Sequence, residues 1–299
     1  MSEPSNPPAS AAELLKEGVA HLQAGERTLA SAALCEARKY PETRLQAHNL
    51  VERHGLEGGF RPMLGLNCEI APADDIFHFF AGHPTSINPL RDYLADGWRT
   101  LSELMLLLEA VDRPLLKTGR FLEFASGHGR FTRHLVKELG AGRVTVSDVV
   151  PDAVDFARAT FGVDGFLSSV SPEALAWEQP YDVVFVLSLF SHLPDRTWAR
   201  WLASLYRAVK PGGLLVFTTH GAEAAQRQNV TLDERGFFFA PSSESQAIEV
   251  AEYGTTFTSD AFVQRSIAQT LDGAQVLQHA PVHFWNHQDA YVVMKPLQG

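Results

Sequence analysis

Cysteine is scarce in this chain, and its two cysteines, Cys35 and Cys68, stand far apart. Neither belongs to a spacing typical of metal sites, so we expect no metal centre. Two cysteines also cannot supply the several bridges of a disulfide scaffold. The composition fits a reducing compartment, and we expect a cytoplasmic protein.

Long apolar runs are missing as well. No stretch approaches the roughly 20 apolar residues that a membrane-spanning helix needs. Residues 1–10 are rich in proline and serine and lack the basic and then apolar segments of a secretion signal. We therefore expect a disordered tail at the start and no role in a membrane.

Basic residues are outnumbered, with 25 Lys and Arg against 35 Asp and Glu, for a net charge of -10. Binding to a phosphate backbone needs a basic surface, so we do not expect DNA or RNA as a partner. The remaining composition, 45% hydrophobic and 20% charged over 299 residues, is that of a globular protein with a large core.

Apolar residues recur at helical spacing over 11–57. Two helices are expected before Pro41, with a break near residues 24–26, and a third over 43–53. The first pair resembles a single tetratricopeptide repeat, with Gly18 and Leu34 at matching positions. One repeat cannot bury its own apolar face. A plain hairpin packed on the main domain and a docking module for a protein partner, through residues 11–54, both stay open.

Residues 58–116 are expected to form a linker and a helical cap. Glycines and prolines up to residue 75 indicate the linker, and separate helices are expected from Asn88 and over 97–111. The aromatic stretch 77–80 could lie near a ligand or in a core between helices.

From Lys117 onward, strands and helices alternate. Strands are expected at 120–124, 143–148, 164–167, 181–189 and 214–219, with helices at 131–139, 151–161 and 197–209. This order is typical of a parallel, doubly wound sheet. Further strands are expected at 247–252, 275–278 and 290–295, and the last two have no helix between them, which predicts an antiparallel edge. The expected fold is α/β: a mostly parallel Rossmann-like sheet with an antiparallel C-terminal edge, a lid insertion at 222–258 and an N-terminal helical extension.

The stretch 119–132 joins a short apolar run to a turn of small residues and then to a helix start. A strand, a tight turn and a helix in this order leave backbone N–H groups pointing outward, where they can bind a polar ligand. Small residues let the backbone approach that ligand closely.

These motifs together resemble the class I S-adenosylmethionine-dependent methyltransferases over residues 117–299. The resemblance rests on the acid and glycine turn at 123–129, on Asp148 at the end of the second strand, on the stretch 181–194, and on the Lys-Pro-Gly-Gly turn at 210–213. It implies S-adenosylmethionine as the cofactor and a small molecule or a metabolite- or glycan-type acceptor as the substrate.

The resemblance also implies which residues hold the cofactor. Gly127 and Gly129 would let the backbone approach its methionine part, and Asp148 would accept hydrogen bonds from both ribose hydroxyls. One departure is Ala125, which replaces the first glycine and whose Cβ disfavours a positive φ. The residues assigned to cofactor binding are Glu123, Ala125, Ser126, Gly127, Gly129, Asp148, Val149, Ser168, Ser169, Leu187 and Ser188.

Methyl transfer needs a general base only where the acceptor must lose a proton. His192 follows the fourth strand, at the edge where open α/β sheets bind ligands, and we expect it to be that base. His220, Tyr253 and His287 lie in segments that could also reach the site.

Two other functions remain open from the sequence. A nicotinamide-dependent oxidoreductase would also place an acid near Asp148, but Arg130 stands where its third glycine is needed. A non-catalytic methyltransferase-like scaffold would explain Ala125 and the lack of an acid after the third strand.

Overall fold

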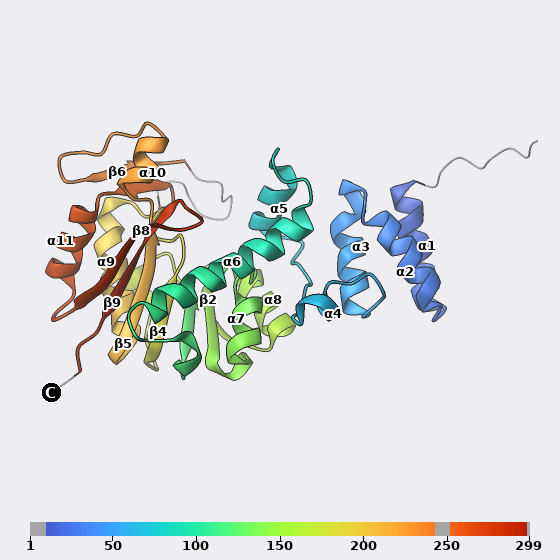
Figure 1. Ribbon diagram of the computed structural model, residues 1–299, viewed down its shortest axis with the longest axis horizontal. Coiled ribbons are helices and arrows are strands. Elements are labelled where there is room, and N and C mark those ends of the chain that lie inside the picture. Colours follow the sequence, from blue (N-terminus) through green and yellow to red (C-terminus); the bar gives the residue numbers. More distant parts are fainter. Residues whose placement is uncertain (1–9, 243–251, 298–299) are drawn as a thin grey trace, which may run out of the picture. The chain divides into compact units, whose positions relative to one another are not determined.

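The computed structural model describes residues 10–242 and 252–297 (Figure 1). The chain divides into two compact units between Asp92 and Tyr93. Across the described residues, no helix has the length and apolarity that crossing a membrane requires.

The first unit is helical. Its helices are α1 (Ala11–Gln23), α2 (Arg27–Ala37), α3 (Pro41–Arg53), α4 (Arg61–Leu64) and α5 (Asp75–Gly82), and α6 (Pro89–Glu109) begins in it. Ser10 caps α1 in a reciprocal pair with Glu13, and Asp74 caps α5. Gly18 lets α1 approach α2 closely, because a Cβ there would lie 2.6 Å from the Leu34 side chain.

Residues 55–75 were expected to be a linker, and much of this segment packs against α3. Leu56, Cys68 and Ile70 are buried. The Asn49 side chain forms two hydrogen bonds with the Ile70 backbone, at 2.7 and 2.9 Å. The glycines and prolines here shape a folded connection, not a flexible one.

The second unit is built on a seven-stranded sheet in the order β3-β2-β1-β4-β5-β9-β8. Its strands are β1 (Phe121–Phe124), β2 (Val144–Asp148), β3 (Asp164–Leu167), β4 (Tyr181–Val186), β5 (Val209–Thr219), β8 (Gln275–Phe284) and β9 (Gln288–Met294). The first five strands are parallel, and β9 and β8 are antiparallel. The predicted fold class is therefore confirmed.

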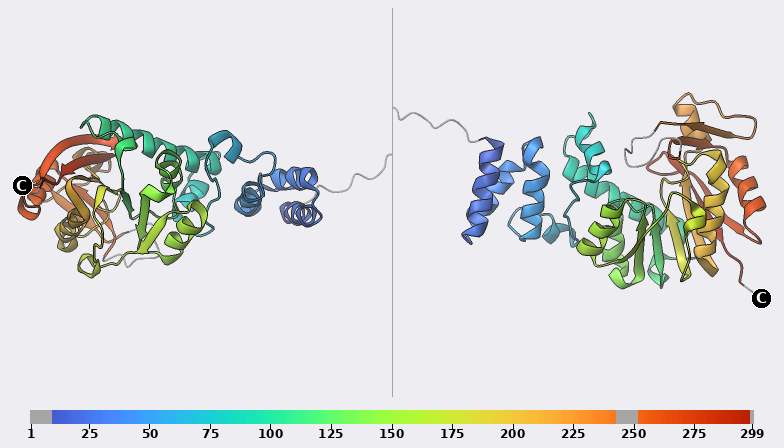
Figure 2. Two further views of the ribbon diagram at one scale, coloured as in Figure 1. Left: turned by 90° about the horizontal axis from the view of Figure 1, so that it is seen from below. Right: turned by 180° about the vertical axis from the view of Figure 1, so that it is seen from behind.

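Helices cover both faces of this sheet (Figure 2). On one face, α9 (Asp195–Ala208) and α11 (Asp260–Thr270) pack on side chains such as Val184 and Val186. On the other, α7 (Thr132–Leu139), α8 (Pro151–Phe161) and the second half of α6 pack on Val183 and Phe185. The apolar run at 181–189 is thus explained by a strand buried on both faces.

The segment after β5 holds α10 (Ala222–Arg227) and a small sheet of β6 (Phe237–Ala240) and β7 (Thr255–Thr258). The strand expected at 247–252 falls almost entirely outside the described residues. The sequence did not predict β7.

Candidate functional site

The turn after β1 lies against the end of β2. Asp148 closes β2, and its carboxylate accepts the Gly127 N–H at 2.8 Å and the Val150 N–H at 3.0 Å. The Ser126 N–H donates to the Ser147 carbonyl at 3.2 Å. Two predicted cofactor residues, Gly127 and Asp148, are therefore in direct contact.

Ala125, the first residue of this turn, has a φ of 60°. An alanine rarely adopts this left-handed conformation, because its Cβ crowds the backbone. Ala125 thus holds a conformation that glycine adopts freely, at a cost of about 1 kcal/mol in strain.

The two glycines of the turn differ in what surrounds them. At Gly127, with a φ of 54°, a Cβ would meet nothing within 4 Å, so the backbone faces open space. At Gly129, with a φ of 82°, a Cβ would lie 2.4 Å from the Phe161 ring. Packing against α8 therefore explains Gly129, whereas Gly127 is free to face a ligand.

Two buried carboxyl groups lie beside the turn. Glu123 accepts a hydrogen bond from the Thr132 hydroxyl at 2.7 Å. Its burial, with a smaller effect from the nearby Asp148 charge, raises its pKa to about 8. Burial also raises the pKa of Asp148, against the effect of the backbone N–H groups that it accepts. This pair favours a positively charged ligand.

The segment after β3 was expected to serve adenine recognition. The Ser168 N–H donates to the Asp148 carbonyl at 2.8 Å, which ties this segment to β2. The Ser169 hydroxyl accepts the Ser171 N–H at 3.0 Å. Val149 and both serines are partly exposed, so they can contact a ligand at this edge.

At the end of β4, Leu187 and Ser188 are partly exposed on the same edge of the sheet. Ser188 has a φ of 60°. Its N–H donates to the Thr218 hydroxyl of β5 at 2.8 Å. A second left-handed residue other than glycine thus follows the strand next to β1, and such strain is common at functional sites.

His192 lies in the turn after β4 and contacts the segment before β7. Its Nδ1 is 2.7 Å from the Gly254 carbonyl, so Nδ1 carries the proton and Nε2 keeps its lone pair. Burial lowers the pKa of His192, which keeps the ring neutral at neutral pH. The ring stacks on Tyr253 with 4.4 Å between centroids. This is the protonation state that a general base needs.

The other histidines named from the sequence lie in the same cluster. The His220 ring is 6.0 Å from that of His192 and 4.9 Å from that of His287. Burial lowers the pKa of His220 to about 3 and that of His287 in the same direction. The cluster is thus polar but neutral.

Gln288, at the start of β9, lies in the stretch 285–289 that was expected to cover the site, but it was given no role of its own. It is 3% exposed and bonds to Thr218, Ser188 and His220. No motif marks it, because its contacts come from strands far apart in sequence. The available signal was a polar residue at the start of an apolar strand.

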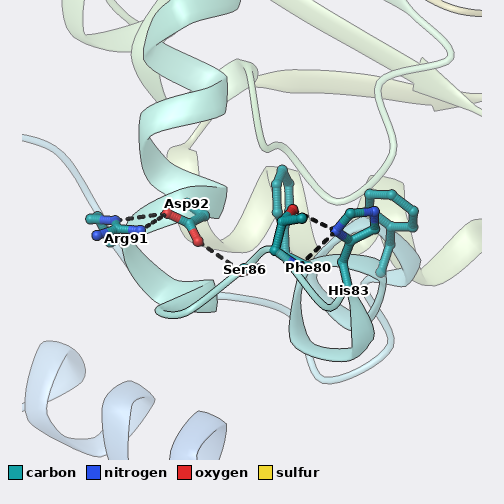
Figure 3. Close-up of a pocket in the computed structure, with 7 residues that line it drawn as sticks. Phe80, His83, Ser86, Arg91 and Asp92 are labelled. Atoms are coloured by element: carbon teal, nitrogen blue, oxygen red, sulfur yellow. Dashed lines mark hydrogen bonds and ion pairs between the residues drawn. The ribbon is translucent and has the colours of Figure 1, made fainter.

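A separate pocket of about 270 Å³ lies within the first unit, lined by Phe79, Phe80, His83, Thr85, Ser86, Arg91 and Asp92 (Figure 3). Its polar groups pair with one another. Arg91 bonds to Asp92, the Ser86 hydroxyl donates to Asp92, and His83 contacts Thr85. Phe79 and Phe80 belong to the aromatic stretch that could lie near a ligand, but no residue assigned to the cofactor or to the base lines this pocket. The sheet edge therefore remains the candidate site.

A protein-family model described as a methyltransferase domain matches residues 121–213, from β1 into β5. Residues 121–213 are therefore similar to a methyltransferase domain. The matched part of the domain contains every residue assigned to the cofactor from the sequence, and His192. The resemblance seen in the sequence motifs is confirmed for this segment.

Two methyltransferases are similar to part of this chain. The ubiquinone biosynthesis O-methyltransferase of Hydrogenovibrio crunogenus is 27% identical over 150 residues, 48% of this chain and 56% of that protein. The N-terminal Xaa-Pro-Lys N-methyltransferase 1 of Bos taurus is 29% identical over 142 residues, 44% of this chain and 57% of that protein. The chain thus spans about half the length of these relatives. Among solved structures, the magnesium protoporphyrin IX methyltransferase of Synechocystis superposes with a TM-score of 0.49 at 14% identity, over 74% of this chain and 93% of that one.

Proposed function

We propose that the protein is an S-adenosylmethionine-dependent methyltransferase that acts on a small molecule or a metabolite- or glycan-type acceptor. The observation that carries the proposal is the contact between Asp148 and the Gly127 N–H, inside the segment that matches the methyltransferase domain. It places a carboxylate and an open glycine backbone together at the carboxyl edge of the sheet, where such folds bind ligands.

The residues at this edge fit the cofactor. Both oxygens of Asp148 accept backbone N–H groups, and a carboxylate has about four acceptor positions, so Asp148 can also accept a hydrogen bond from the ribose. Gly127 has room for the methionine part. When bound, S-adenosylmethionine supplies a methyl group on a positively charged sulfur. A cation near Glu123 would lower its raised pKa and leave it ionised and paired.

His192 is proposed as the general base. Its Nδ1 proton is engaged by the Gly254 carbonyl, so Nε2 can accept a proton from the acceptor's O–H or N–H. Stacking on Tyr253 fixes the plane of the ring. We expect His192→Gln to lower the rate of transfer by about 100-fold or more, with cofactor affinity unchanged.

A small acceptor fits the surroundings better than a nucleic acid. The net charge of -10 disfavours a phosphate backbone. The relatives named above include an O- and an N-methyltransferase, and a neutral histidine serves either kind of acceptor.

Calorimetry with S-adenosylmethionine tests the proposal directly. We expect the wild type to bind and Asp148→Asn to lose at least tenfold in affinity, about 1.4 kcal/mol. Asp182→Asn is the control. Asp182 lies at the start of β4, where it accepts the Arg120 N–H at 2.7 Å and pairs with Lys210, so its loss should leave affinity unchanged. A wild type that does not bind would refute the proposal, and binding without turnover on any acceptor would indicate the scaffold function instead.

A further inference from the structure

Ser188 is held at three points. Its N–H donates to the Thr218 hydroxyl at 2.8 Å, and its carbonyl accepts the Ser191 hydroxyl at 2.9 Å. Its own hydroxyl oxygen lies 2.8 Å from Nε2 of Gln288. A residue with a left-handed backbone is thus fixed in both main chain and side chain.

Gln288 connects this residue to the histidine cluster. Its Oε1 accepts the Thr218 hydroxyl at 2.6 Å. Its Nε2 reaches both the Ser188 hydroxyl, at 2.8 Å, and Nε2 of His220, at 3.4 Å. Thr218 and Gln288 are 0% and 3% exposed, so the network is closed to solvent on this side.

The orientation of the Gln288 amide follows from His220. Nδ1 of His220 is 3.2 Å from the Thr256 carbonyl, which can only accept, so the proton sits on Nδ1. A neutral ring then has a lone pair on Nε2, and Gln288 must donate to it. The reversed amide would need a doubly protonated His220, which burial opposes by lowering its pKa to about 3.

The hydrogen bonds of Thr218 and Ser188 lead to the same orientation of the Gln288 amide. The Thr218 hydroxyl oxygen accepts the Ser188 N–H, and its proton goes to Oε1 of Gln288. Each amide hydrogen of Gln288 then has an acceptor, Ser188 or His220. The Ser188 oxygen receives a hydrogen bond, so its own proton must point elsewhere. Nothing among residues 10–242 and 252–297 accepts that proton.

We propose that Gln288 is a positioning residue that fixes the Ser188 hydroxyl as a hydrogen-bond donor to the methyl acceptor. The substrate that receives the methyl group would then carry two neighbouring groups. One is its nucleophilic O–H or N–H, and the other is an atom that accepts the hydrogen bond from Ser188. This inference rests on the proposed function and names the substrate class of the same site. We assign the Ser188 hydroxyl to the methyl-accepting substrate, not to the cofactor, because of its neighbours. Ser188 and His220 both bond to Gln288, and the His220 ring neighbours that of His192, the proposed base.

The methyl-transfer test uses matched probes with labelled S-adenosylmethionine: phenol against 2-methoxyphenol, and aniline against 2-methoxyaniline. In each pair, the second compound adds an acceptor oxygen beside the nucleophile. We expect the wild type to prefer a methoxy compound at least tenfold in kcat/KM, which is about 1.4 kcal/mol. Ser188→Ala and Gln288→Glu should each remove that preference, and the double variant should lose no more.

Gln288→Glu is the sharpest variant, because a carboxylate only accepts. It would draw the Ser188 proton inward, and it would favour protonation of Nε2 of His220 by accepting a hydrogen bond from the protonated nitrogen. The other titratable groups facing His220 are His192 and His287. Nitrogen-15 histidine spectra should show His220 as the Nδ1–H form, without titration between pH 5 and 8, in the wild type, and with a raised pKa in Gln288→Glu. Gln275→Glu, at the exposed end of β8, is the control.

Three results would overturn the inference while cofactor binding is intact: no preference for the methoxy compounds, no methylation of any probe, or an unchanged His220 spectrum in Gln288→Glu. A loss of cofactor affinity above tenfold in Ser188→Ala would assign the donor to the cofactor instead. A wild type that does not bind S-adenosylmethionine would refute the proposed function itself, which is a different result.

Discussion

Ala125 and Ser188 show at the scale of single residues how the site is built. Both have a φ of 60° and follow the neighbouring parallel strands β1 and β4. Residues other than glycine are strained at this φ, and such a conformation persists only where surrounding contacts stabilise it. For Ser188 the holding groups are Thr218 and Gln288. The sequence marked Ala125 as a departure but gave no sign of Ser188's conformation.

Replacing Ala125 by glycine should therefore not destabilise the fold. We expect Ala125→Gly to leave the free energy of unfolding unchanged or to raise it by up to about 1 kcal/mol, because relief of strain offsets the freedom gained by the unfolded chain. Ala203→Gly, in the middle of α9, is the control and should lose about 0.5–1 kcal/mol. Urea unfolding measures both, and equal losses would contradict the strained turn.

Glu123 should make stability depend on pH. Its pKa is about 8 in the folded chain, against a usual value of 4.5. Below pH 4.5 the Glu123 carboxyl is protonated in both the folded and the unfolded chain, so its full contribution to the free energy of unfolding is present. As the pH rises towards 8 only the unfolded chain ionises, so stability falls by up to about 1.4 kcal/mol per pH unit.

Chemical unfolding between pH 5 and 8 measures this slope. Glu123→Gln should flatten it, because the amide does not titrate. Glu138→Gln, an exposed acid on α7, should keep the wild-type slope. An unchanged slope in Glu123→Gln would show that another group carries the dependence.

At the scale of elements, the parallel strands were predictable and the packing exceptions were not. Apolar runs located β1, β2 and β4 within a few residues, because buried strands carry such runs. The helices expected from Asn88 and over 97–111 are one helix, α6. Gly97 was expected to begin the second of these helices. It lies inside α6, where its lack of a Cβ permits a close approach, because a Cβ there would lie 2.2 Å from the Arg130 carbonyl oxygen. A local sequence pattern does not contain this contact.

Gly97→Ala tests that explanation of α6. Alanine favours an exposed helix over glycine by about 1 kcal/mol. At Gly97, however, the new Cβ would press on backbone at Arg130, which cannot move as a flexible side chain would. We expect a net loss of about 1–3 kcal/mol in the free energy of unfolding. A gain in stability on thermal or urea unfolding would mean that the close approach is absent.

The antiparallel edge shows the same limit for the candidate site. Two strands were predicted at 275–278 and 290–295. Both observed strands, β8 and β9, are longer, and β9 begins at Gln288. Register pairs Thr219 with Asp289, which brings the start of β9 beside the end of β5. The glycine turn and Asp148 could be found from motifs. Gln288 could not, because its role depends on that register.

At the scale of the whole molecule, the candidate site lies within one unit. Every residue assigned to cofactor or base, and the two core clusters around the sheet, belong to residues 93–299. The net charge and composition gave the class of protein, but they contain no information on where one compact unit ends. That boundary falls inside α6, which is one helix from Pro89 to Glu109.

A fragment that begins at Asn88 should therefore fold and bind the cofactor. Asn88 accepts the Arg91 N–H at 3.1 Å, so the start of α6 keeps its cap. We expect the fragment 88–299 to unfold cooperatively and to bind S-adenosylmethionine with a Kd within about threefold of the full chain, a difference below 1 kcal/mol. Asp148→Asn in the fragment should lose affinity as it does in the full chain. A fragment that folds but does not bind would mean that residues before Asn88 supply part of the cofactor site.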